Sequence, residues 1–261
     1  MRFPKTVAKS SGFSRIFAFG LMIFSGAGLI NLCTVCAETT DELQGPPVVQ
    51  SHIIGIDPGH QGPNVDMSDL EPLGPGSTEM KAKASTGTQG TFSGLPEYQL
   101  NLDVALKLRD ELEARGYEVY MIRETNDVDI SNAERAQLAA ESGSDILIRI
   151  HANGSDNTSV AGALTMAPST ANPYLSQEMI AECQKLSQCI ITAFCASTGA
   201  NNQGVYQTDE MSGLNWCSIP ATIVEMGYMT NQEEDTRMQT ADYQQQMVTG
   251  IADGIDQYFA S

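Results

Sequence analysis

The chain has 261 residues, of which 14 are Lys or Arg and 32 are Asp or Glu, so its formal net charge is −18 at pH 7. The first 37 residues carry four basic and no acidic side chains, which leaves 10 basic against 32 acidic residues, a net charge of −22, in the rest. This charge excludes the binding of nucleic acid or of a membrane surface by bulk electrostatic attraction. The 41% hydrophobic content is enough for one sizeable core and excludes disorder or a coiled coil.

The N-terminus has the features of an export signal. Basic residues are followed by an uncharged, mostly apolar stretch, Ile16–Ala37, which ends in small residues of the kind that a signal peptidase prefers. We therefore predict a signal peptide over residues 1–37. The alternative is an uncleaved membrane anchor, because about 20 apolar residues can span a bilayer. Either interpretation places the rest of the chain outside the cytoplasm.

The remainder reads as a short linker and one domain. Residues 38–51 are polar and contain a Pro-Pro pair, which is typical of a spacer. No fixed-period repeat and no second hydrophobic block follows, so residues 52–261 are predicted to form a single domain.

Strand-like and helix-like segments alternate along this domain. The strands are predicted at His52–Ile56, Tyr117–Ile122, Asp145–Ile150, Ala163–Met166 and Ala221–Glu225. The helices are predicted at Glu97–Arg115, at Ala133–Ala140 with Ser131 or Asn132 as its cap, along the apolar stripe Leu175–Phe194, and around Met247–Ile255. This alternation predicts an α/β fold, a three-layer αβα domain with a largely parallel central sheet.

Four polar side chains fall where an open α/β sheet forms its sites, outside the carboxyl ends of the strands. His60 lies four residues beyond Ile56, His151 directly follows Ile150, Glu225 closes its own strand, and Glu97 starts a helix. Two histidines and one carboxylate are a common ligand set for a catalytic zinc and leave its fourth position for water. His52 begins its strand at the opposite end of the sheet, so we expect it to be structural.

Each of these residues also has a plainer interpretation. A single His after a strand is often only a hydrogen-bonded structural residue, and Glu97 alone could be a first-turn acid favoured by the helix dipole. Glu225 is harder to explain in this way, because a carboxylate that ends a buried apolar run is costly without a partner.

Five strings of residues, in this order, resemble a known family: IIGIDPGHQG, LPEYQLNLDVALKLRDELEARGYEVYMIRETND, AERAQLA, DILIRIHANG and IPATIVEMGYMTNQEED. The family is that of the zinc-dependent N-acetylmuramoyl-L-alanine amidases of bacterial cell-wall hydrolysis, and the resemblance spans Ile53–Phe259. It implies that His60, Glu97 and His151 bind Zn²⁺ and that Glu225 is the catalytic general base and acid. The implied reaction is hydrolysis of the amide bond between N-acetylmuramic acid and L-alanine in peptidoglycan.

The segment Gln61–Pro96 departs from the commonest family pattern. It has 36 residues, more than the usual connection between the first His and the Glu, and is rich in Gly and Pro. We predict a surface loop at the mouth of the site, which either shapes substrate choice or is a solvated insertion without function. No inserted helix that could plug the site is evident between Ala163 and Gly204, so we expect an open site.

Four cysteines follow the predicted signal peptide. If Cys183, Cys189 and Cys195 share one helix, neighbours six residues apart are separated by about 9 Å along its axis, too far for a disulfide. At most one disulfide, to Cys217, then remains, and we expect buried free thiols.

Two other classes of function stay open at the level of sequence. One is a different extracellular zinc hydrolase, such as a peptidase or a deacetylase, although no HExxH motif is present. The other is a catalytically inactive wall-binding protein. Under the amidase interpretation we expect a secreted, monomeric protein at the cell wall. Its partner would be peptidoglycan and not nucleic acid, and only an uncleaved N-terminal segment would contact a membrane.

Overall fold

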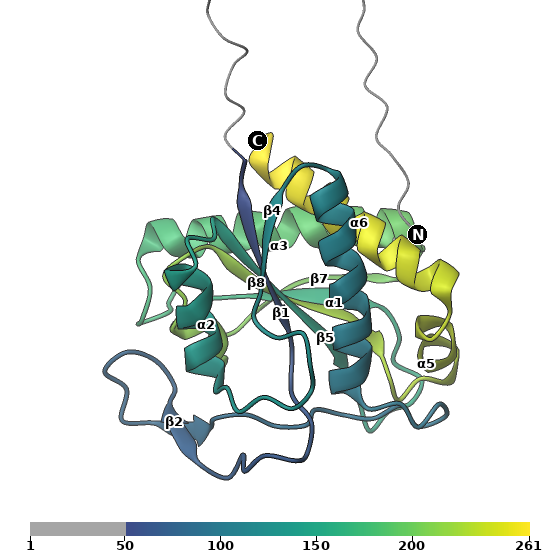
Figure 1. Ribbon diagram of the computed structural model, residues 1–261, viewed down its shortest axis with the longest axis horizontal. Coiled ribbons are helices and arrows are strands. Elements are labelled where there is room, and N and C mark those ends of the chain that lie inside the picture. The colour runs from purple at the N-terminus through teal and green to yellow at the C-terminus, as the bar shows by residue number, and fades with distance from the viewer. Residues whose placement is uncertain (1–50) are drawn as a thin grey trace, which may run out of the picture. The chain divides into compact units, whose positions relative to one another are not determined.

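A six-stranded sheet forms the centre of residues 51–261, the part of the chain that the computed structural model describes (Figure 1). The predicted signal peptide, 1–37, and nearly all of the predicted linker, 38–51, lie outside the described residues. The strands are β1 (Ile53–Pro58), β4 (Glu118–Met121), β5 (Ile146–Asn153), β6 (Ala163–Ala167), β7 (Asn202–Gln207) and β8 (Ala221–Tyr228).

The sheet is largely parallel, as predicted. Its strand order is β4-β1-β5-β8-β6-β7, and within it only β6 and β8 pair antiparallel. All eight residues of β8 are buried, as expected for a strand that is covered on both faces.

Helices cover both faces of the sheet and complete the αβα architecture (Figure 1). They are α1 (Glu97–Ala114), α2 (Asn132–Glu141), α3 (Gln177–Thr198), α4 (Ser212–Asn215), α5 (Gln232–Met238) and α6 (Ala241–Phe259). Leu100 of α1, Phe194 of α3 and Ile251 of α6 share the larger core, while Ala136 of α2 and Leu214 of α4 belong to the core on the other face. None of the helices within residues 51–261 is long and apolar enough to cross a membrane.

The ends of the helices follow local chemistry. Ser131 is the N-cap of α2 and forms a capping box with Glu134, which resolves the choice between Ser131 and Asn132. Helix α1 ends just before Gly116, whose φ of 93° is available to glycine at little cost.

Strands β5 and β8 continue furthest past their predicted ends, by three residues each. The ladder between β5 and β8 continues past Ile150, so that His151 and Glu225 pair as register partners inside their strands. The prediction that His151 follows its strand and that Glu225 closes its own was therefore wrong. It used the last apolar residue as the strand end, whereas backbone hydrogen bonds extend the ladder whatever the side chain.

Several short elements were not predicted. The segment 61–96 is not a simple loop, because it contains a two-stranded antiparallel sheet of β2 (Leu70–Pro72) and β3 (Met80–Ala82). Helices α4 and α5 were also missed, since each is too short to carry a clear period of apolar residues. Strand β7 was missed because only Val205 and Tyr206 of its six residues are apolar.

The four cysteines are free thiols, two of them less buried than expected. Cys183 and Cys217 are buried, whereas Cys189 and Cys195 are only half-buried. Burial raises the pKa of the Cys183 thiol to about 11, which makes it unreactive at neutral pH.

Candidate active site

The side chains of His60, Glu97 and His151 converge at the carboxyl ends of β1 and β5. His60 Nε2 lies 3.1 Å from Glu97 Oε1 and 3.2 Å from His151 Nδ1. His151 Nδ1 lies 3.3 Å from Glu97 Oε1. Three atoms that can ligate a metal thus form a nearly equilateral triangle, and they come from three separate parts of the chain. The triangle lies where the sequence predicted a metal site.

The triangle has the dimensions that a tetrahedral metal requires. Ligand atoms at about 2.0–2.1 Å from zinc, arranged tetrahedrally, are separated from one another by about 3.3 Å. The observed separations of 3.1, 3.2 and 3.3 Å match this value without movement of the backbone. Two imidazoles and a carboxylate are also donor types that zinc prefers, so the residues present fit the ion.

The protonation states suit metal binding as well. Burial lowers the pKa of His151 to about 4, against the opposing effect of Glu97, so the ring is neutral at pH 7 and has a free lone pair. Burial alone would raise the pKa of Glu97, but the neighbouring His151 and His60 rings outweigh it and hold that pKa well below its usual value. The carboxylate is therefore ionised.

A further set of contacts orients His60 and Glu97. His60 Nδ1 lies 3.1 Å from the backbone oxygen of Ser85, and donation of its proton there leaves Nε2 free to bind a metal. Glu97 Oε1 accepts hydrogen bonds from the Ala152 amide at 3.1 Å and from Asn101 Nδ2 at 3.2 Å. The second oxygen of Glu97, Oε2, accepts from the Thr88 amide at 2.9 Å.

The turn that carries His60 has an unusual backbone. His60 adopts a φ of 63°, the left-handed region that costs a residue with a Cβ roughly 1–2 kcal/mol. The preceding Gly59 is packed so closely that a Cβ there would lie 2.2 Å from the His151 ring. The DPGH string thus needs glycine for a steric reason.

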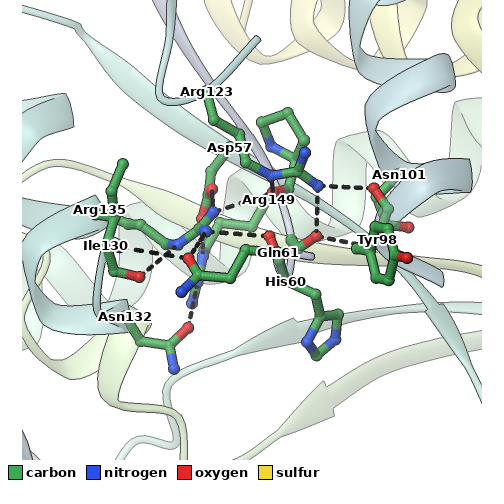
Figure 2. Close-up of polar contacts among 12 residues, drawn as sticks. Asp57, His60, Gln61, Tyr98, Asn101, Arg123, Ile130, Asn132, Arg135 and Arg149 are labelled. Atoms are coloured by element: carbon green, nitrogen blue, oxygen red, sulfur yellow. Dashed lines mark hydrogen bonds and ion pairs between the residues drawn. The ribbon is translucent and has the colours of Figure 1, made fainter. Parts of the chain in front are cut away.

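Two buried arginines bind the carbonyl groups of this turn (Figure 2). Arg123 donates to the oxygens of Pro58 at 2.7 Å and Gly59 at 2.9 Å. Arg135 donates to the oxygens of Pro58 and His60, both at 3.0 Å. These hydrogen bonds offset the backbone strain and fix the direction in which His60 points.

Asp57 pairs with Arg135 and with a third buried arginine, Arg149. Its carboxylate oxygens lie 2.6 Å from Arg135 Nη1 and 2.7 Å from Arg149 Nε, and all three side chains are buried. Burial alone would raise the pKa of Asp57, but the charges of Arg135 and Arg149 hold it well below its usual value.

Glu225 lies next to His151 on the neighbouring strand, and the pleat directs both side chains to the sheet face that α2 and α4 cover. Its Oε2 atom is buried without a hydrogen-bond partner among the described residues. Burial and the charge of Glu97 raise the pKa of Glu225 to about 8. A carboxyl group with such a pKa can hold and release a proton near neutral pH.

A cavity of about 280 Å³ gives access to these groups. His60, His151 and Glu225 line it together with apolar residues such as Met166 and with Lys81 of the segment 61–96. No residue of α3, the helix between Ala163 and Gly204, is part of its lining.

His52, which we expected to be structural, lies away from this site. It directly precedes β1, at the opposite end of the strand, where its Nδ1 lies 3.2 Å from Asp145 Oδ2 and its ring stacks on that of Phe259 with 3.8 Å between the ring centroids. The structural interpretation of His52 is confirmed.

The sequence analysis did not identify the residues that hold His60, Glu97 and His151 in position. Asn101 could have been found, because it lies one helical turn after Glu97 and so shares its face. Arg149 also carried a signal, since a charged residue within the apolar run DILIRI requires a buried partner. The partners themselves, Asp57 and Asn132, lie 92 and 17 residues away in the chain, and no pattern of spacing connects them to Arg149.

Comparison with known proteins now adds to the geometry. Residues 54–257 match the model of the family Amidase_3, described as N-acetylmuramoyl-L-alanine amidase. The chain is 26% identical over 229 residues to the N-acetylmuramoyl-L-alanine amidase LytC of Bacillus subtilis, which covers 88% of this chain but only 39% of LytC. It is 23% identical over 219 residues to the N-acetylmuramoyl-L-alanine amidase Rv3717 of Mycobacterium tuberculosis, covering 83% of this chain and 90% of Rv3717.

Solved structures agree with these matches. The N-acetylmuramyl-L-alanine amidase Ami1 of Mycobacterium smegmatis superposes with a TM-score of 0.72 at 25% identity, over 80% of this chain and 97% of that one. An N-acetylmuramoyl-L-alanine amidase of Clostridium difficile 630 superposes with a TM-score of 0.66 at 25% identity, over 81% of this chain and 98% of the other.

Proposed function

The chain belongs to the Amidase_3 family of N-acetylmuramoyl-L-alanine amidases, and from this we propose that it is a zinc-dependent hydrolase of peptidoglycan. The bond cut joins the lactyl group of N-acetylmuramic acid to L-alanine of the stem peptide. The observation that carries the proposal is the triangle of His60 Nε2, Glu97 Oε1 and His151 Nδ1 beside Glu225, whose buried Oε2 has no hydrogen-bond partner within residues 51–261.

In this proposal His60, Glu97 and His151 hold the ion. When bound, zinc supplies Lewis acidity that activates water and polarises the amide carbonyl. Neutral imidazoles and an ionised carboxylate give the site two uncharged ligands and one anionic ligand. The amide of Ala152 and the side chain of Asn101 hold Glu97 in its orientation, so little reorganisation is needed when the ion binds.

Glu225 moves the proton. It takes a proton from the attacking water and returns it to the departing alanine nitrogen, so one residue serves as base and then as acid. Its burial next to His151 makes both protonation states accessible near neutral pH, because the uncharged form is stabilised there.

We further propose that the protein acts outside the cytoplasm, at the cell wall, and as a monomer. Residues 1–37 would direct its export, with cleavage after Ala37 or retention as an anchor. Mass spectrometry of the protein recovered from its producing cell distinguishes these two outcomes.

The test of the reaction is a digest of purified peptidoglycan. An amidase creates a new amino group on L-alanine and leaves the glycan strands at unchanged length, so labelling of amines and sequencing of the labelled products identifies the bond. New reducing ends would indicate a glycosidase, and amines inside the stem or cross-bridge would indicate a peptidase. Removal of metal with a chelator should abolish the reaction and added zinc should restore it. A product without labelled alanine would contradict the proposed function.

A further inference from the structure

The segment 61–96 is fixed to the body of the domain by a buried carboxylate. Glu71 of β2 is only 6% exposed. It accepts hydrogen bonds from the Ala133 amide at the start of α2, at 2.9 Å, and from the Ser212 hydroxyl of α4. Trp216 Nε1 also donates to the Pro72 oxygen at 2.8 Å. The segment 61–96 is therefore packed against the domain through buried hydrogen bonds and is not a solvated insertion.

Because β3 pairs with β2, this anchoring also places β3 at the cavity. Lys81, Ala82, Ala84 and Ser85 line the cavity together with His60 and Glu225. In Figure 1 the segment runs below the sheet, at the end where β1 finishes. The segment thus contributes one wall of the candidate active site.

Lys81 is the one Lys or Arg among the described residues that line this cavity. Its ammonium group donates to the backbone oxygen of Glu210, and no carboxylate of residues 51–261 forms an ion pair with it. Its cross-strand partner, Glu71, uses its carboxylate for Ala133 and Ser212.

Lys83, two residues along the same segment, shows the usual arrangement. Its ammonium group lies 3.3 Å from Asp69 and 3.2 Å from Asp129, and it does not line the cavity. The two lysines therefore differ in the feature that matters here, because the charge of Lys83 is neutralised and that of Lys81 is available for a ligand.

We propose that Lys81 binds a free carboxylate of the stem peptide, so that the enzyme prefers acidic stems to stems whose carboxylates are amidated. This inference rests on the proposed function, since it assigns the peptide to the cavity beside Glu225. A charge-assisted hydrogen bond supplies the recognition, and an amide, which is uncharged, would form a weaker one. The net negative charge of the chain repels anionic peptides, so the positive charge of Lys81 is needed for such a peptide to enter the cavity.

The test uses two muramoyl peptides that differ only in whether the stem carboxylates are free or amidated. The wild-type protein should favour the free acid by about 10- to 100-fold in kcat/KM, the range expected for a hydrogen bond to a charged group. Lys81→Met keeps the length of the side chain but removes the charge, so it should abolish this preference. The change should appear in KM, with kcat and zinc content unaltered. Lys83→Met is the matched control and should retain the preference.

A binding measurement separates this inference from the proposed reaction. Titration of the same two peptides into the Glu225→Gln variant, with and without Lys81→Met, reports recognition without turnover. Preferential binding that is lost with Lys81→Met supports the inference even if the bond cleaved proves to be another one. If wild type and Lys81→Met discriminate equally, or if neither peptide is preferred, the inference is overturned whether or not the amide is cleaved.

Discussion

Replacement of Arg135 by Met tests whether the buried arginines hold the turn that carries His60. Arg135 is 1% exposed and Asp57 is fully buried, and their closest atoms are 2.6 Å apart. Removal of one partner from such a pair costs about 3–5 kcal/mol. Arg149 still pairs with Asp57 at 2.7 Å, so the lower end of that range, about 3 kcal/mol, applies.

The loss of hydrogen bonds adds to this cost. The oxygen of His60 loses its donor, Arg135 Nη2, whereas the oxygen of Pro58 keeps Arg123 as a donor. One unsatisfied carbonyl costs about 1–3 kcal/mol. We therefore expect a total loss of about 4 kcal/mol, out of the roughly 5–15 kcal/mol by which a domain is usually stable.

Urea unfolding of the metal-free protein at pH 7 measures this loss. For a domain of this size the same loss lowers Tm by about 8–16 °C. Arg109→Met is the control, because Arg109 pairs with Asp110 and Glu124, both largely exposed, and should cost less than about 1 kcal/mol. Zinc affinity, measured by competition with a chromophoric chelator, should also fall by about 10- to 100-fold for Arg135→Met. If Arg135→Met costs no more than Arg109→Met and leaves zinc affinity unchanged, the reasoning is refuted.

Three further substitutions test the site itself. His151→Ala should lose both zinc, measured by metal analysis, and amidase activity, and retention of one zinc per chain would remove His151 from the ligand set. Gly59→Ala should weaken zinc binding in a chelator titration, because the new Cβ would lie 2.2 Å from the His151 ring; unchanged affinity would show that the ring can move freely. Glu225→Gln should keep zinc but lower kcat by about 10²- to 10⁴-fold, whereas release of the metal would make Glu225 a ligand. In the metal-free protein the pKa of Glu225 is raised from its usual 4.5 to about 8, so its contribution to stability is present below pH 4.5 and is lost as the pH rises to 8. Glu225→Gln should therefore be more stable than wild type at pH 8, by up to about 5 kcal/mol, but not at pH 4.5; urea unfolding curves with the same pH dependence for both proteins would disprove this.

The sequence was sufficient for the parts of the fold that depend on local periodicity. The nearly continuous apolar run DILIRI predicts a buried strand. The spacing of four residues between Leu100, Val104, Leu108 and Leu112 predicts α1. Since parallel strands end at one edge of a sheet, these elements also bring the donor residues to one place. Their separations depend on backbone details, such as the φ of His60, that no pattern encodes.

Other features depend on contacts between distant parts of the chain. Strands β2 and β3 have three residues each and are positioned by Glu71, whose hydrogen-bond partners lie 62 and 141 residues further along. From its Gly and Pro content, the segment 61–96 was predicted to be a surface loop. Glu71 could not be recognised as its anchor, because the residues that it contacts are distant in the sequence. The same reason explains why the function of the segment stayed open at the level of sequence.

The few basic side chains of the domain have two different roles at the site. After the first 37 residues the chain has only 10 basic side chains, yet Arg123, Arg135 and Arg149 are buried behind the proposed metal ligands, and Lys81 lines the cavity. The buried guanidinium groups cannot bind a substrate directly, because their N–H groups donate to Asp57 and to backbone oxygens. They make the His60 turn rigid. Attraction of an anionic peptide towards a chain of this acidity must then depend on an accessible cation, and raising the salt concentration should reduce the preference for free carboxylates while leaving zinc binding by the arginine-supported ligands unchanged.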